Sequence, residues 1–236
     1  MQSAIKNFWH EQRRELGFFA SLRKLLFVAF EFLRDSLPDR RRARFGDTDY
    51  DWEYRVDTTS ANVGWRARLL GLLNSPYQPI EPVLFQQIMH SLDVDFRNFT
   101  FVDIGSGKGR ALLLASECPF LHIVGVELLP ELNEIAQENN RHFRSSHQEG
   151  APIDTICGDA AKFVFPAGPL IVLLNNPLPP TGLRAVISNI EAALNEMPRL
   201  VFVIYANPML ESIVRESHVL EKIGGTLQYA LFRSKQ

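Results

Sequence analysis

Cysteine is scarce in this 236-residue chain, which contains only Cys118 and Cys157. Both stand among apolar residues, and two cysteines cannot form a disulfide framework. We therefore expect two reduced thiols, as in a cytoplasmic protein. The cysteines and histidines also lack the spacing of a zinc site, so no metal ion is expected.

Long apolar runs are absent as well. A membrane-spanning helix needs about 20 apolar residues, but the longest run near the N-terminus covers only residues 25–30, and charged residues flank it. Residues 1–15 are polar and of mixed charge, without the apolar stretch and cleavage site of a secretory signal. The sequence thus predicts neither a membrane span nor secretion.

Charge of one sign does not dominate, because 25 Lys and Arg stand against 27 Asp and Glu. The net charge of −2 gives no reason to expect a nucleic-acid partner. The distribution is nevertheless uneven, since residues 1–44 carry ten basic and five acidic side chains. A basic leader therefore precedes an acidic body.

The leader contains one predicted helix, over residues 16–37, in which apolar side chains recur at helical spacing. Pro38 ends this helix, and an arginine cluster follows at residues 40–44. Two interpretations fit. The helix packs on the main domain, or residues 16–44 make weak contact with an anionic membrane surface. The second interpretation would make a cytoplasmic protein a peripheral membrane protein.

The segment after the leader, residues 45–74, mixes aspartates with aromatic residues and shows no clear periodicity. Its aspartates do not follow the spacing of a loop that binds a hard cation, so we predict a structural loop or lid. This divides the chain into an N-terminal helical extension with a lid, residues 1–76, and a main domain, residues 77–236.

The main domain alternates short apolar runs with longer amphipathic segments. This pattern predicts a doubly wound α/β fold with a mostly parallel sheet, closed by an antiparallel C-terminal hairpin around Gly224 and Gly225. The predicted strands cover residues 99–104, 121–127, 153–157, 170–174, 200–205, 219–223 and 227–232, and the predicted helices cover residues 83–92, 108–117, 131–145 and 181–197.

A glycine-rich loop follows the first predicted strand. The strand brings Asp103 to the loop, which then runs through Gly105, Ser106, Gly107 and Gly109 into a helix. Arg110 stands where a dinucleotide-binding loop requires its third glycine, and the Gly-Lys-Ser/Thr of a phosphate-binding loop is missing. Neither of these ligand classes is therefore predicted by the loop.

The remaining pattern, Asp-x-Gly-x-Gly-x-Gly, resembles motif I of the class I S-adenosylmethionine-dependent methyltransferases. The resemblance implies their seven-stranded fold and S-adenosylmethionine as the cofactor. It places the methionine part of the cofactor over Gly105, Ser106, Gly107 and Gly109, and Asp103 near its amino group.

Two further strand ends resemble the same family. Glu127 ends the second predicted strand, where a carboxylate accepts the two ribose hydroxyls, and Leu128 follows it as a further cofactor contact. Asp159 and Ala160 resemble the family's Gly-Asp-Ala motif, whose carboxylate meets the adenine amine. The alternative for Asp159 is to cap the helix that follows.

The fourth strand end resembles the Asn-Pro motif of amino-methylating enzymes and the double asparagine of the non-SET protein-lysine methyltransferases. The resemblance places Asn175, Asn176 and Pro177 at the reacting methyl group, with Asn175 also touching the cofactor. Leu178 stands where the amino-methylating enzymes carry an aromatic residue. A simple strand-to-helix turn is the alternative.

Two upstream segments carry weaker likenesses. Tyr77 belongs to a Tyr-x-Pro element that closes over the cofactor in some protein-lysine methyltransferases, and Asp57 lies in a segment similar to a bacterial Asp-Thr loop. No histidine lies in a recognised motif, so no general base is predicted.

These features predict an S-adenosylmethionine-dependent methyltransferase with an unidentified acceptor, among which an amine of a protein lysine or a small molecule is favoured. A non-catalytic cofactor-binding or scaffold module is the first alternative, and an NAD(P)-dependent oxidoreductase is the second. The sequence does not indicate an oligomeric state.

Overall fold

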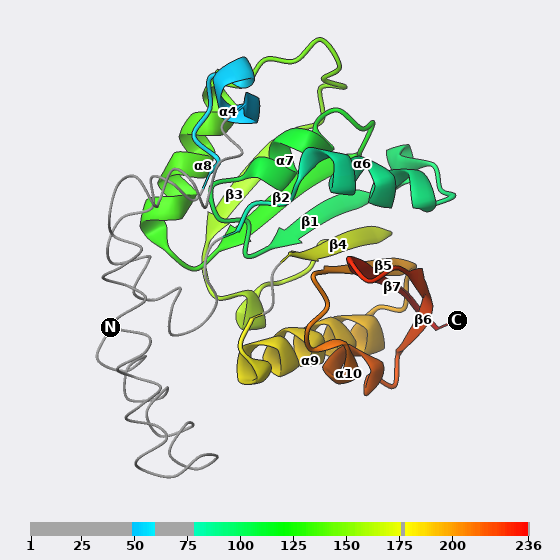
Figure 1. Cartoon of the computed structure of the whole chain (residues 1–236). Helices are drawn as coiled ribbons and strands as arrows, with labels where there is room; N and C mark the ends of the chain where they lie inside the picture. Colours follow the sequence, from blue (N-terminus) through cyan, green and yellow to red (C-terminus); the bar gives the residue numbers. More distant parts are fainter. Residues whose placement is uncertain (1–48, 60–77, 176–177, 236) are drawn as a thin grey trace, which may run out of the picture.

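The computed structural model describes residues 49–59, 78–175 and 178–235 (Figure 1). Three groups of predictions lie outside these residues. They are the leader helix with its basic cluster, the cofactor contact of Tyr77, and the catalytic placement of Asn176 and Pro177.

The described residues form one seven-stranded sheet with the strand order β3-β2-β1-β4-β5-β7-β6. Strands β1 to β5 are parallel, and β7 runs antiparallel to both of its neighbours, β5 and β6. The strands are β1 (Thr100–Ile104), β2 (His122–Glu127), β3 (Ile153–Cys157), β4 (Leu170–Asn175), β5 (Val201–Ala206), β6 (Leu220–Gly225) and β7 (Tyr229–Ser234).

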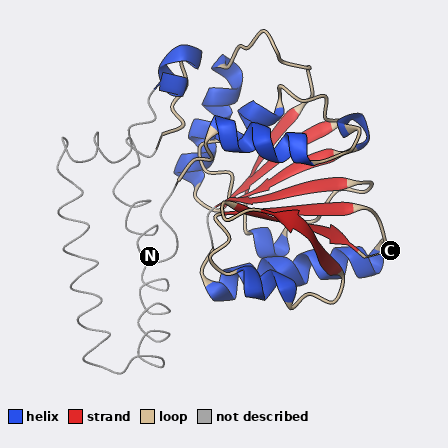
Figure 2. Ribbon diagram, turned by 45° about the vertical axis from the view of Figure 1, so that its right-hand side comes forward, coloured by secondary structure: helices blue, strands red, loops and turns tan. Residues whose placement is uncertain are grey.

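Helices cover both faces of this sheet (Figures 1 and 2). On one face lie α6 (Pro82–Ser91), α7 (Arg110–Ala115) and α8 (Pro130–His142), with the short α4 (Asp49–Tyr54) beside α8; on the other lie α9 (Pro180–Glu196) and α10 (Glu211–Arg215). Two short 3-10 helices are η2 (Phe96–Asn98) and η3 (Ala160–Lys162).

Two apolar cores result, because successive side chains of a strand point to opposite faces. Phe101 and Ile171 belong to the core beneath α6 and α7, whereas their neighbours Val102 and Val172 belong to the core beneath α9. All four side chains have no accessible surface. The predicted doubly wound, mostly parallel α/β fold with an antiparallel C-terminal hairpin is therefore confirmed.

The hairpin corrects one detail of the prediction. Gly224 and Gly225 lie inside β6, beside a β-bulge, and the turn falls on the residues that follow. Gly225 has φ +130°, and a Cβ atom there would lie 2.4 Å from the carbonyl oxygen of Tyr229. The glycine is required by close contact between two strands rather than by a turn.

Two short helices were also missed, α4 and α10. Both are shorter than two turns, too short for helical periodicity to be visible in the sequence. Helix α4 falls in the segment predicted as an irregular loop or lid. Tertiary contacts hold it: Tyr50 is buried, and the rings of Tyr54 and Phe143 lie 5.1 Å apart.

Candidate active site

The candidate site lies where the chain switches direction across the sheet. Strand β1 pairs with β2 on one side and with β4 on the other, so the loops after β1 and β4 leave the sheet to opposite faces. Ligands of open α/β sheets bind at such a point, beyond the carboxyl ends of the strands. The glycine loop follows β1 here, and Asn175 ends β4.

The glycine loop owes its shape to left-handed backbone conformations. Gly105, Gly107 and Gly109 have φ of +78°, +54° and +85°, which residues with a Cβ atom rarely adopt. Gly109 also lies against α8, because a Cβ atom there would be 3.1 Å from that of Ala136. The backbone conformation of the loop and its contact with α8 therefore explain why glycine stands at these positions.

Glu127 supports the loop from β2. Its Oε2 accepts a hydrogen bond from the Gly107 N–H at 2.8 Å, and its Oε1 accepts one from the Leu129 N–H at 2.8 Å. Burial raises the pKa of Glu127, and these backbone donors partly offset that rise. A carboxylate can accept about four hydrogen bonds in all, so Glu127 retains acceptor capacity for a ligand hydroxyl.

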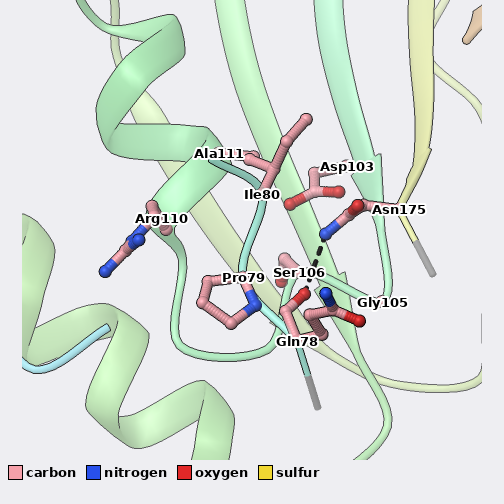
Figure 3. A pocket seen from close by; sticks show the side chains of 9 residues that line it. All are labelled: Gln78, Pro79, Ile80, Asp103, Gly105, Ser106, Arg110, Ala111 and Asn175. Atoms are coloured by element: carbon pink, nitrogen blue, oxygen red, sulfur yellow. Dashed lines mark hydrogen bonds between the residues drawn. The ribbon is translucent and has the colours of Figure 1, made fainter. Parts of the chain in front are cut away.

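A small pocket opens between the glycine loop, the end of β4 and the segment from Gln78 to Ile80 (Figure 3). Three of the residues that line this pocket carry a buried side-chain oxygen: Asp103 Oδ1, Ser106 Oγ and Asn175 Oδ1. None has a hydrogen-bond partner among the described residues. A buried polar atom without a partner costs free energy, so the pocket is suited to a ligand that donates hydrogen bonds. The residues that line the pocket are Gln78, Pro79, Ile80, Asp103, Gly105, Ser106, Arg110, Ala111 and Asn175.

Among the residues that line this pocket, Asp103 has a strongly shifted pKa. Its side chain is almost fully buried, and burial together with the Glu127 carboxylate raises the pKa of Asp103 to about 8. A cationic donor beside this carboxyl would restore its charged form.

The amide of Asn175 has a fixed orientation. Its Nδ2 donates to the backbone oxygen of Gln78 at 2.9 Å, which leaves Oδ1 as the atom that faces Asp103 across the pocket (Figure 3). Beyond Asn175, Leu178 packs partly against the core beneath α9, which begins at Pro180. The Pro-rich segment therefore also starts a helix, as the turn interpretation expects.

The remaining predicted cofactor residues lie at the neighbouring strand ends. Asp159 is exposed, and its Oδ1 accepts from the Ala161 N–H at 3.0 Å, so it caps η3, which begins at Ala160. Leu128 is 62% exposed, although it is a large apolar side chain. The Gly158 N–H donates to the backbone carbonyl oxygen of Glu127, which brings the ends of β2 and β3 together.

Two charged side chains in and beside the glycine loop, Lys108 and Arg110, were not predicted as site residues from the sequence. Lys108 is completely buried, and its Nζ lies 2.7 Å from Asp57 Oδ1 and 2.9 Å from the Thr59 oxygen. Arg110 is almost as deeply buried and bonds to Thr58 Oγ1 at 2.6 Å. The sequence did contain a signal for this contact: two basic residues beside the glycine loop, and an aspartate-rich segment upstream to which no function had been assigned.

The side chain of Arg110 points away from Asp103 and Asn175 (Figure 3). Its Nη2 lies 3.2 Å from Asp51 Oδ1, and its guanidinium carbon lies 4.9 Å from the centre of the Tyr50 ring. Arg110 thus contributes to the wall of the pocket while its charge is directed toward α4.

Neither a metal site nor a membrane span is visible in the described part of the chain. No group of three or more His, Cys, Asp and Glu side chains there could hold a metal ion. Among the same residues, no helix combines the length and apolarity needed to cross a bilayer.

Comparisons with known proteins give structural similarities only. No protein-family model matches the chain, and no curated protein sequence matches it significantly. Solved structures with a similar fold include ribosomal protein L11 methylase from Lactobacillus delbrueckii subsp. bulgaricus, at 16% identity and a TM-score of 0.45 over 66% of this chain and 76% of that one. An RNA methyltransferase from Salinibacter ruber in complex with S-adenosyl-L-homocysteine has 17% identity and a TM-score of 0.42 over 66% and 92%. Magnesium protoporphyrin IX methyltransferase from Synechocystis PCC 6803 with bound SAM has 15% identity and a TM-score of 0.46 over 66% and 79%.

Proposed function

We propose that this protein is an S-adenosylmethionine-dependent methyltransferase that acts on an amine. One observation carries the proposal: three residues that line one pocket beside the glycine loop, Asp103, Ser106 and Asn175, each carry a buried side-chain oxygen without a partner among the described residues. The Asp103 oxygen can accept a hydrogen bond from the α-amino group of a methionine moiety.

The surrounding residues fit the rest of the cofactor. The carboxylate of Glu127 retains capacity to accept hydrogen bonds from the ribose hydroxyls. Leu128 offers an exposed apolar side chain for the adenine ring, and Asp159 retains an exposed carboxylate oxygen for the adenine amine.

S-Adenosylmethionine, when bound, supplies a methyl group on a cationic sulfur, which needs no further activation. The chain then has to orient the acceptor and exclude water. Asn175 Oδ1 suits an amine acceptor, because it can accept an N–H hydrogen bond and Gln78 holds its orientation. This asparagine cannot take up a proton, so it would orient the amine rather than act as a base.

The sheet argues against the oxidoreductase alternative. The usual dinucleotide-binding sheet has six strands in the order 3-2-1-4-5-6. Here the antiparallel β7 lies between β5 and β6. Arg110, which occupies the third-glycine position of the dinucleotide loop, is directed toward α4 and not toward a ligand phosphate in the pocket.

Calorimetric titration with S-adenosylhomocysteine tests the cofactor assignment. Asp103→Ala and Glu127→Ala should each weaken binding by about tenfold or more, since each removes a hydrogen bond to a charged group. Asp154→Ala is the matched control, because Asp154 is an exposed carboxylate on β3 that pairs with His122. Unchanged affinity in both folded site variants would reject the assignment.

Turnover distinguishes an enzyme from a non-catalytic binding module. We expect label from a methyl-labelled donor to appear in a fractionated cell extract, in protein or in small molecules, and to be lost with Asp103→Ala. Tight binding of the cofactor without transfer to any fraction would instead support the scaffold alternative.

The leader remains a separate proposal, in which residues 16–44 rest on an anionic membrane surface. Cosedimentation with vesicles that contain anionic lipid should be stronger for the full chain than for a chain that begins near Phe45. Equal and negligible binding by both would leave only the packing role.

A further inference from the structure

Residues 49–59, which we call the N-terminal strap, contact the glycine loop through two buried cations. Lys108 and Arg110 flank the last glycine of the loop, and their side chains bond to Asp57 and to Thr58, respectively. Neither cation serves the pocket oxygens described above. The glycine loop thus uses its charged side chains to hold a segment about 50 residues upstream.

We infer that the strap positions the glycine loop, and that Asp57 and Lys108 are positioning residues for the ligand that the loop binds. The inference rests on the proposed function for the identity of that ligand, but the contact itself is independent of it. The experiments therefore measure the hydrogen exchange of the loop without ligand and the binding of ligand to it.

Asn139 of α8 strengthens this contact from a third element. Its Nδ2 donates to the backbone oxygens of Lys108 and Asp57, at 2.9 and 2.8 Å, and its Oδ1 accepts from the Asp57 N–H at 2.8 Å. One amide therefore joins the backbone of the loop to the backbone of the strap. A change on either side alters the hydrogen bonds of the other.

Asp51 fixes the strap internally, so that it approaches the loop in one conformation. Its carboxylate accepts from the N–H groups of Thr58 and Thr59, both at 2.8 Å, and from the Thr58 hydroxyl. Thr58 in turn accepts from Arg110 Nε. These hydrogen bonds join the short α4 to residues 57–59, which contact the loop.

The burial of Lys108 explains why losing the strap would disturb the loop. The ammonium group has no accessible surface, and removing the carboxylate that neutralises a buried charge is strongly unfavourable. Without Asp57, the buried Lys108 ammonium group would lose a neighbouring carboxylate, and Lys108 stands between Gly107 and Gly109. Gly107 donates to Glu127, so the disturbance would reach the carboxylate that faces the ligand.

Hydrogen exchange on the ligand-free protein is the first test. In Asp57→Ala, peptides covering residues 101–112 should exchange about tenfold faster or more, while peptides of β6 and β7 should not change. The control is Glu216→Ala, which breaks an exposed pair with Arg184 and should leave the loop unaffected. Unchanged exchange of the loop in folded Asp57→Ala would overturn the inference.

Titration with S-adenosylhomocysteine is the second test. Asp57→Ala should weaken binding by about tenfold, and saturating ligand should slow exchange in the wild-type strap by a similar factor, because coupling between two sites is reciprocal. Asp57→Glu, which retains a carboxylate, should recover much of the affinity. Equal affinity of wild type and Asp57→Ala would also overturn the inference.

The two tests separate this inference from the proposed function. If the wild-type protein does not bind S-adenosylhomocysteine, the proposed cofactor fails, and the exchange of the loop still decides the positioning role. If the wild type binds and Asp57→Ala binds equally well, the positioning role fails and the cofactor stands. Should Asp57→Ala not fold, Asp57→Asn, which retains an oxygen acceptor for Lys108, takes its place in both tests.

Discussion

Asp103 shows how strongly one residue depends on its surroundings. It is the fourth residue of β1, whose five residues are all buried, and its Oδ1 finds no partner among the described residues. Burial and Glu127 together raise the pKa of this carboxyl to about 8. The protein therefore keeps an unfavourable group at its candidate site, as functional sites commonly do.

Replacing Asp103 by Asn should change how stability depends on pH. In the unfolded chain an aspartate loses its proton near pH 4, whereas Asp103 in the folded protein holds it up to about pH 8. The contribution of Asp103 to the free energy of unfolding is therefore complete below about pH 4 and declines as the pH rises through 8. Asp103→Asn lacks this decline, so its stability relative to wild type should increase from pH 5 to pH 8.

Urea denaturation of both proteins at several pH values measures this difference. We expect the gap in unfolding free energy to widen toward pH 8 and to level off above it. A gap that stays constant across this range would mean that Asp103 is already charged in the folded protein.

At the scale of the elements, the packing of β2 against the glycine loop leaves no room for a side chain at Gly125. A Cβ atom there would lie 2.6 Å from Leu112 Cδ1 and 2.8 Å from Ser106 Oγ. Leu112 belongs to α7 and is itself buried, so it cannot simply move aside. Because Gly125 has no side chain, β2 can lie this close to the glycine loop and to α7.

Gly125→Ala should consequently destabilise the protein by about 1–3 kcal/mol, as overpacking of a core does. Chemical denaturation measures the loss, and Gly224→Ala in β6 serves as the control because nothing lies within 4 Å of a Cβ atom there. We expect the control to stay within about 0.5 kcal/mol of wild type. Equal stability of Gly125→Ala would show that the loop has another way to pack.

At the scale of the whole molecule, the last strand of the sequence completes the sheet. Strand β7 lies between β5 and β6, so β6 is joined to the sheet only through a strand that comes after it in the chain. All six residues of β5 are buried. Removing β7 would expose the edge of a strand that is apolar on both faces, which favours aggregation.

A chain that ends at residue 228 should therefore fail to form this fold, and size-exclusion chromatography should show aggregated or insoluble protein. Leu227→Ser is the control in the same hairpin, since Leu227 is 99% exposed at its tip, and it should elute like wild type. A soluble, cooperatively folded truncation would show that the first five strands form a stable sheet without β7.

Much of the architecture was readable in the sequence because its causes are local. The apolar runs predicted β1 to β5 to within one residue at each end, and the glycines of the loop mark backbone angles that other residues avoid. The alternation of strands and helices was sufficient to predict the doubly wound sheet. These features depend on neighbouring residues and on spacing alone.

The tertiary structure decided the features that depend on distant segments. Asp57 and Lys108 are 51 residues apart, and no local pattern indicates that a loop lysine is buried against an upstream aspartate. The amide orientation of Asn175 depends on Gln78, 97 residues earlier, and the role of Gly225 depends on the strand beside it. The scarcity of cysteine and of long apolar runs excluded whole classes of protein, but only the fold brought together the three oxygens of the pocket, because they come from different strand ends and loops.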